Sequence, residues 1–172
     1  MKQRIEEAKK ILLDNRKNGY TLPTNNKLYP AQWNWDSAFI ALGYSYFNLN
    51  YALEEMETLL AGQWDDGMVP HILFHDNDTT YFPNHTTWKC GKNIPSSGIT
   101  QPPVIASILK IILGNQQINE GQNNRVVQII KKIKKYHDWF IKFRDPNKTG
   151  LISILHPWES GYDNSPIWDA VS

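Results

Sequence analysis

The sequence predicts an all-α protein built from helical hairpins, each pairing a solvent-facing helix with a buried one. Stretches with one apolar stripe and charged residues elsewhere are typical of surface helices, as in residues 3–16, 50–61 and about 125–143. Stretches that are apolar on every side must be surrounded by protein, as in residues 35–47 and 102–113. The two kinds alternate along the chain, and no convincing strand pattern accompanies them.

The outer helices are recognised by where their charges fall. In the first, Ile11 and Leu12 lie on a stripe that the Glu and Lys residues avoid. In the second, Met56 lies on the apolar stripe while Glu55 is expected on the solvent side. The third carries a lysine run at 131–135 off its stripe, and such a run is typical of a solvated face rather than a binding patch.

Each inner helix begins at a cluster of polar and aromatic residues. Residues 33–36 (WNWD) precede the first inner helix, and residues 101–103 (QPP) precede the second. Residues 163–166 (DNSP) start a third, with Ser165 as the cap before a first-turn proline. If the inner helices run parallel, the three clusters meet on one rim, where helix N-termini also supply backbone donors.

Residues 62–99 contain many turn formers and show no sustained helical or strand period. A loop of this length inside a compact domain is more often a lid or a binding loop than filler. We therefore expect residues 62–99 to form a lid or substrate loop within the domain.

The stretch from 156 to 169 combines aromatic rings, three carboxylates and two turn residues. Asp163 lies in an irregular loop just ahead of a helix, with Trp158, Tyr162 and Trp168 close in sequence. Such rings stack on the apolar face of a sugar, and partial burial raises the pKa of a neighbouring carboxylic acid. Asp163 is thus a candidate proton donor for sugar cleavage. The alternative is a Trp-rich helix start whose acids only bond backbone amides.

Composition limits the classes of partner. The 172 residues suit one domain, and a net charge of +1 with 20% charged residues gives no signature of a nucleic-acid or membrane partner. A small neutral carbohydrate suits this balance, and the seven Trp, eight Tyr and six Phe exceed what a modest core needs. The single cysteine and the charged N-terminus favour a cytoplasmic protein.

A metal site could be drawn from His71, His75, His85 and Cys90, but zinc sites have tighter pairs of ligands on a compact scaffold. No phosphate loop or dinucleotide fingerprint is present either. We therefore predict no metal and no cofactor.

Four motifs, which extend over most of the chain, resemble those of one enzyme family. They are Tyr29 with residues 33–36, residues 63–71 (QWDDGMVPH), residues 97–103 (SGITQPP) and the 156–169 stretch. Together they resemble glycoside hydrolase family 63, in its branch of mannosylglycerate and glucosylglycerate hydrolases, in the clan that also holds trehalases and glucoamylases. The resemblance implies an (α/α)6 barrel of inner and outer helices and an inverting mechanism.

The resemblance also implies roles for individual residues. Asp163 matches the general acid, and the motifs match substrate-binding positions at Tyr29, Trp33, Trp35, Asp36, His71, Gln101, Trp158 and Gly161. Glu159 is expected to be a sugar ligand or a modulator of Asp163. A second reading makes Asp36 the catalytic base, although its family counterpart binds sugar instead.

The sequence departs from the family in length. Family members run to more than twice 172 residues, and their catalytic base is a Glu in the C-terminal half of the barrel. We therefore expect residues 1–172 to be the N-terminal half of one catalytic domain, an incomplete barrel of about three hairpins whose C-terminal half is missing. The isolated chain is expected to be inactive. The alternatives are a trehalase-like hydrolase and a non-catalytic carbohydrate-binding or remnant helical domain.

Overall fold

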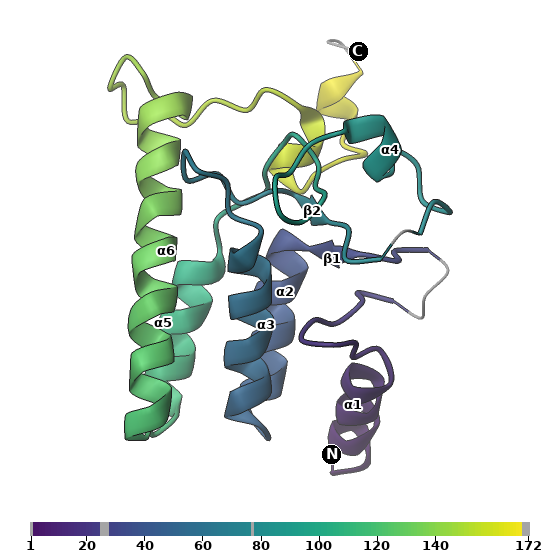
Figure 1. The fold of residues 1–172 in the computed structure, drawn as a ribbon, viewed down its shortest axis with the longest axis vertical. Coiled ribbons are helices and arrows are strands. Elements are labelled where there is room, and N and C mark those ends of the chain that lie inside the picture. The colour runs from purple at the N-terminus through teal and green to yellow at the C-terminus, as the bar shows by residue number, and fades with distance from the viewer. Residues whose placement is uncertain (1, 25–27, 77, 170–172) are drawn as a thin grey trace.

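The computed structural model describes residues 2–24, 28–76 and 78–169 and confirms the all-α prediction. Four helices stand side by side with alternating direction: α2 (Asn34–Ser45), α3 (Leu49–Ala61), α5 (Ile105–Asn115) and α6 (Glu120–Arg144) (Figure 1). The N-terminal helix α1 (Lys2–Asp14) packs beside α2, where the Tyr44 hydroxyl donates to the Leu12 carbonyl at 2.8 Å.

Consecutive helices form the two hairpins α2–α3 and α5–α6. Short polar links connect them, and Asn48 and Asn119 cap the second helix of each hairpin by accepting from backbone N–H groups. Both α2 and α5 therefore begin at the same end of the bundle, where Figure 1 shows most of the irregular chain. The three predicted N-terminal clusters are brought to this rim.

The rim carries the remaining short elements. Strands β1 (Gln32–Trp33) and β2 (Ile72–Leu73) pair antiparallel, with Trp33 opposite Ile72. Helix α4 (His85–Trp88) and the 3₁₀ turns η1 (Pro157–Ser160) and η2 (Pro166–Trp168) lie at the same end (Figure 1). The expectation of no strand was wrong at β1 and β2, because a two-residue pair is too short to produce an alternating pattern. Ser165 caps η2 as expected, and the predicted continuation of the third inner helix beyond 169 lies outside the described residues.

The core lies between the hairpins and is centred on α3. Leu53, Met56, Leu59 and Leu60 are completely buried there against side chains of α2, α5 and α6. Each such side chain contributes about 1.5–3 kcal/mol on burial. The outer helix α3 is thus more deeply buried than the sequence pattern indicated.

The inner helices are less enclosed than expected. Phe39 on α2 is 51% exposed and Ile111 on α5 is 43% exposed, although both helices are apolar nearly all round. Within this chain each helix has neighbours on part of its circumference only. The pattern of α2 and α5 therefore suits a larger assembly of helices than these two hairpins provide.

Glu55 was expected in solvent, and this prediction was wrong. Its side chain is completely buried, and Oε1 accepts from Gln32 Nε2 at 3.0 Å and from Ser37 Oγ at 2.7 Å. The apolar pattern of a helix assigns every Glu to the polar side, but side chains from another element can donate hydrogen bonds to a carboxyl inside the protein. Burial raises the pKa of Glu55 to about 7.

The raised pKa makes stability depend on pH. The pKa of Glu55 rises from 4.5 to about 7 on folding, so the folded state holds the proton more tightly. Its contribution to stability is full below about pH 4.5 and is lost as pH rises through 7. In the wild type, the free energy of unfolding should therefore fall by up to about 3 kcal/mol between pH 4.5 and 8 because of Glu55. We predict that Glu55→Gln, which cannot ionise, abolishes this part of the fall.

Urea unfolding across this pH range checks the prediction, and Glu57→Gln on the same helix is the matched control. Glu57 lies in a half-exposed pair with Arg125, and its replacement should leave the slope in place. Equal slopes for wild type and Glu55→Gln would contradict the prediction.

Candidate functional site

A cavity of about 370 Å³ opens at the rim, beside the N-terminus of α2. Every predicted site residue except Glu159 lines it. The lining residues are Pro23, Thr24, Tyr29, Trp33, Trp35, Asp36, His71, Tyr81, Gln101, Trp158, Gly161, Asp163 and Asn164.

Aromatic rings form much of the wall. Trp33 is 5% exposed, and the rings of Tyr29 and Tyr81 meet it edge-on at centroid distances of 5.1 and 5.2 Å. The His71 ring lies 6.4 Å from Trp33 and 6.1 Å from Trp158. Such a wall presents faces and edges against which the C–H groups of a sugar ring can pack.

Hydrogen bonds fix the first turn of α2 against two other segments. The Asn34 N–H donates to the His71 carbonyl at 3.0 Å, and the Trp35 N–H donates to Gln101 Oε1 at 3.1 Å. The side chain of Gln101 thus satisfies one of the free N–H groups at the helix start. Trp35, His71 and Gln101 are held in one place although they are far apart in sequence.

The hydroxyl of Tyr136 on α6 lies behind this arrangement and is completely buried. It accepts from Asn34 Nδ2 at 3.1 Å, donates to the Gln101 carbonyl at 2.9 Å and lies 2.5 Å from Thr100 Oγ1. Asn34 Nδ2 also reaches the Val69 carbonyl at 3.2 Å. Two segments of the rim therefore meet at one buried phenol, and the Val69 carbonyl joins them through Asn34 and Thr100.

The loop that carries Asp163 packs against α2 through Gly161. Gly161 has a φ of +71°, and a Cβ at this position would come within 2.5 Å of the Trp35 ring. Only glycine combines this left-handed conformation with such close approach. The matched glycine thus brings the loop against Trp35 and places Asp163 in the cavity wall.

Glu159, which was expected to be a sugar ligand or a modulator of Asp163, is the one predicted site residue that does not line the cavity. It is 6% exposed and pairs with Arg144, and its oxygens also accept from the N–H groups of Thr100 and Leu155. In these contacts both carboxylate oxygens of Glu159 bind groups inside the protein. Glu159 instead ties the loop of Asp163 to the end of α6 and to the segment that carries Gln101.

Burial raises the pKa of both carboxyls of the cavity. Burial, together with the charge of Asp163, raises the pKa of Asp36 to about 6. Partial burial also raises the pKa of Asp163, against the opposing effect of its own backbone N–H and of His156. Burial lowers the pKa of His71 to about 3, so its imidazole is neutral at ordinary pH.

Four lining residues were missed by the sequence reasoning: Pro23, Thr24, Tyr81 and Asn164. Asn164 adjoins the acid candidate, and its place in the DNSP segment was a usable signal. Tyr81 lies in the predicted 62–99 loop, where an aromatic residue among turn formers was the only hint. Nothing in the sequence pattern pointed to Pro23 or Thr24.

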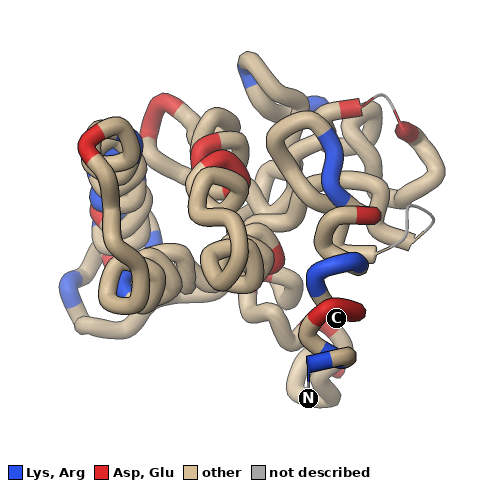
Figure 2. Tube along the Cα trace, turned by 90° about the horizontal axis from the view of Figure 1, so that it is seen from below, with Lys and Arg blue, Asp and Glu red and all other residues tan. Residues whose placement is uncertain are grey.

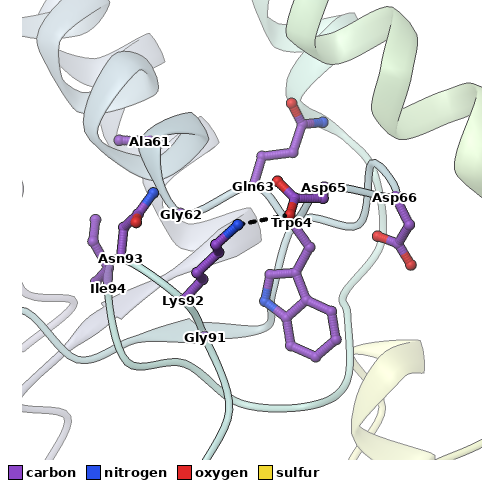
Figure 3. Close-up of a pocket in the computed structure, with 10 residues that line it drawn as sticks. All are labelled: Ala61, Gly62, Gln63, Trp64, Asp65, Asp66, Gly91, Lys92, Asn93 and Ile94. Atoms are coloured by element: carbon purple, nitrogen blue, oxygen red, sulfur yellow. Dashed lines mark hydrogen bonds and ion pairs between the residues drawn. The ribbon is translucent and has the colours of Figure 1, made fainter.

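The 63–71 motif contributes to the cavity mainly through His71. Gln63 donates to the Lys132 carbonyl, Trp64 Nε1 to Ser96 Oγ, and Asp66 accepts from Trp139 Nε1. The contacts of Gln63 and Asp66 join the end of α3 to α6, and that of Trp64 joins it to the segment before α5. A second cavity of about 420 Å³ lies beside this turn, and the pair between Lys92 and Asp65, at 3.3 Å, links its two sides (Figure 3).

The alternative metal ligands do not assemble. His71 lines the cavity, His75 is hydrogen-bonded to Gln32, and Cys90 Sγ donates to the Trp88 carbonyl. No cluster of three His, Cys, Asp or Glu suited to a metal occurs among residues 2–24, 28–76 and 78–169.

Acidic and basic positions are interspersed along the trace in Figure 2, and the lysines of α6 are exposed as expected. In the described part of the chain, no helix combines the length and the apolar character needed to cross a membrane.

Comparison with known proteins gives consistent matches. A domain model described as "Mannosylglycerate hydrolase MGH1-like glycoside hydrolase domain" matches residues 29–172. Mannosylglycerate hydrolase MGH2 of Selaginella moellendorffii is 44% identical over 168 residues, which cover 97% of this chain and 34% of that protein. Glucosylglycerate hydrolase of Mycolicibacterium hassiacum is 37% identical over 155 residues, which cover 83% of this chain and 35% of that protein.

A solved structure gives the same result for the fold. The glycoside hydrolase family 63 mannosylglycerate hydrolase from Thermus thermophilus, in complex with Tris and D-glycerate, superposes with a TM-score of 0.89 at 42% identity. The match covers 96% of this chain and 39% of that one. The fold is therefore part of an (α/α)6 barrel, as expected. The chain spans about a third to two fifths of the length of these relatives.

The buried pair of Arg144 and Glu159 gives a prediction for stability. Arg144→Met leaves the Glu159 carboxylate without its counter-charge at a side-chain exposure of 3%, and should lower the free energy of unfolding by at least about 3 kcal/mol. Urea denaturation measures this change. Lys134→Met removes the exposed pair with Asp138 from the same helix and should cost less than about 1 kcal/mol. Equal effects of the two substitutions would contradict the prediction.

Proposed function

Because the chain belongs to the mannosylglycerate hydrolase MGH1-like family of glycoside hydrolases, we propose that it supplies the sugar-binding and proton-donating part of an inverting α-glycosidase. The observation that carries the proposal is the position of Asp163. This carboxyl shares one cavity wall with Trp33, Trp35 and Trp158, and its partial burial raises its pKa.

In this proposal Asp163 is the general acid. A carboxylic acid that keeps its proton near neutral pH can deliver it to the oxygen of the leaving group as the glycosidic bond breaks. The indoles restrict water and pack against the sugar, while Asp36 and Gln101 bond its hydroxyls. No cofactor is needed for this chemistry.

Inversion requires a second carboxylate, about 6.5–9.5 Å from the acid, that activates water on the opposite face of the sugar. We propose that this base lies outside the present chain, in the part of the barrel that the relatives possess and this chain does not span. We assign Asp36 to sugar binding rather than to the base because its counterpart in the hydrolase family binds sugar; a pKa of about 6 would suit either role.

The cavity favours a neutral sugar. The lining that the described residues form contains two carboxyls and no Lys or Arg, so these residues offer no counter-charge to an acidic group. For a glucosyl- or mannosylglycerate, which the names of the relatives suggest, the sugar would occupy this cavity and the glycerate would be held by the remaining part of the barrel. The same neutral lining also suits a trehalase-like substrate made of two neutral sugars, which we retain as the second candidate.

The 62–99 segment contributes the lid in this proposal. Its residues 67–74 are buried and held by β2, so closing belongs to the more exposed residues after them, which carry Tyr81 to the cavity. We also retain the expectation of a cytoplasmic protein, since its single cysteine is free.

Substituting Asp163 tests the proposal in the completed enzyme, meaning this chain together with the residues that complete the barrel. Asp163→Asn should lower kcat by about 10²- to 10⁴-fold on a glycerate glycoside, because the leaving oxygen then lacks a proton donor. An aryl α-glycoside with an activated leaving group needs little protonation and should be affected far less. Asp36→Asn should weaken binding of both substrates.

Initial rates on the two substrates measure these effects, and proton NMR of the first product should show the β-anomer. The isolated 172-residue chain is the control and should give no turnover. Equal losses on both substrates after Asp163→Asn, or hydrolysis by the isolated chain, would contradict the assignment.

A further inference from the structure

We propose that Glu55, on the outer helix α3, is a positioning residue of the sugar site, which fixes Trp33, Trp35 and Asp36 without touching the sugar. The inference rests on the proposed function and adds to it a residue outside the cavity. Glu55 does not line the cavity, and it lies outside the four motifs that resemble the hydrolase family.

The contacts of Glu55 connect α3 to the two ends of the segment that forms the cavity wall. Gln32 in β1 donates through Nε2 to Glu55 Oε1 at 3.0 Å and to the Glu55 carbonyl at 3.2 Å. Ser37 in the first turn of α2 donates to the same Oε1 at 2.7 Å. Gln32 precedes Trp33, and Ser37 follows Asp36, so one buried oxygen holds residues 32–37 at both ends.

The network continues from Gln32 to the segment that follows β2. Gln32 Oε1 lies 2.7 Å from His75 Nε2, and since that oxygen can only accept, the imidazole donates. His75 stacks on Tyr20 at 4.2 Å between ring centroids, and Tyr20 donates to Asp76. Through Gln32, the carboxyl of Glu55 is therefore linked to the start of the segment that carries Tyr81.

A role limited to stability explains this arrangement poorly. A carboxyl at zero exposure, among the leucines of α3, loses its hydration, and an apolar side chain of similar volume often stabilises such a position equally well or better. Unlike an apolar side chain, the carboxyl forms directional hydrogen bonds, and its acceptor oxygen therefore fixes the positions of the Gln32 amide and the Ser37 hydroxyl. Those two residues flank the side chains that face the sugar.

Two substitutions in the completed enzyme test the role. Glu55→Ala removes the acceptor and should raise KM for the glycoside about tenfold, because two buried donors lose their partner and the wall of the site loosens. Glu55→Gln retains an acceptor oxygen and should keep KM within about twofold of wild type. In both variants kcat per folded enzyme should stay within about threefold, because other contacts, those of Gly161 and Glu159, hold Asp163.

Ser37→Ala is a second test if Glu55→Ala does not fold. It removes only the donor between Glu55 and the first turn of α2, and should raise KM about threefold. Glu57→Gln breaks the surface pair with Arg125 on the same helix and should leave KM unchanged. Circular dichroism gives the folded fraction at the assay temperature for every variant.

Unchanged KM in the folded fraction of Glu55→Ala or, where that variant does not fold, of Ser37→Ala would overturn the inference and leave Glu55 with a structural role only. An equal rise of KM in Glu57→Gln would also overturn it. Absence of hydrolysis by the wild-type completed enzyme is a different outcome, since it would overturn the proposed function and this inference with it.

Discussion

The buried hydroxyl of Tyr136 is the point on which the site depends. It bonds Asn34 at the start of α2 and, at Thr100 and the Gln101 carbonyl, the segment before α5, and so holds two remote segments at one end of the bundle. An outer helix thereby determines where the inner helices begin. If this phenol were absent, the Gln101 carbonyl would lose its donor at a cost of about 1–3 kcal/mol, while Asn34 and Thr100 would keep only their bonds to backbone carbonyls. The cavity is therefore shaped by polar contacts behind it as much as by the aromatic rings in its wall.

Much of this arrangement could be predicted because it follows from local patterns. The alternation of one-sided and all-round apolar helices predicts hairpins, and helix-start residues at 33–36, 101–103 and 163–166 predict a common rim. Asp163 was singled out by the indoles near it and by its place ahead of a proline-started turn. The cavity that it lines contains all but one of the residues assigned from the motifs.

The failures share a physical cause, which is that charged and aromatic side chains can find partners from elements remote in sequence. Glu55 lies on the polar side of a helical pattern, yet Gln32 and Ser37 donate to its Oε1 in the interior. Glu159 stands beside Trp158 in the acid loop, yet Arg144 turns it away from the cavity. Tyr81 reaches Trp33 only because the chain folds back after β2. The hydrophobic periodicity of a sequence describes a single helix or strand, whereas these contacts join two elements that are remote in sequence.

The proposed chemistry requires a sugar ring among the three indoles with the Asp163 carboxyl at its glycosidic oxygen. A crystal structure of the completed enzyme with bound glucose or mannose measures this arrangement. We expect the ring to lie against Trp33, Trp35 and Trp158, with a carboxyl oxygen of Asp163 within about 2.5–3.0 Å of the anomeric hydroxyl. A sugar bound elsewhere, or an Asp163 carboxyl turned to solvent in the complex, would contradict the assignment of Asp163 as the acid.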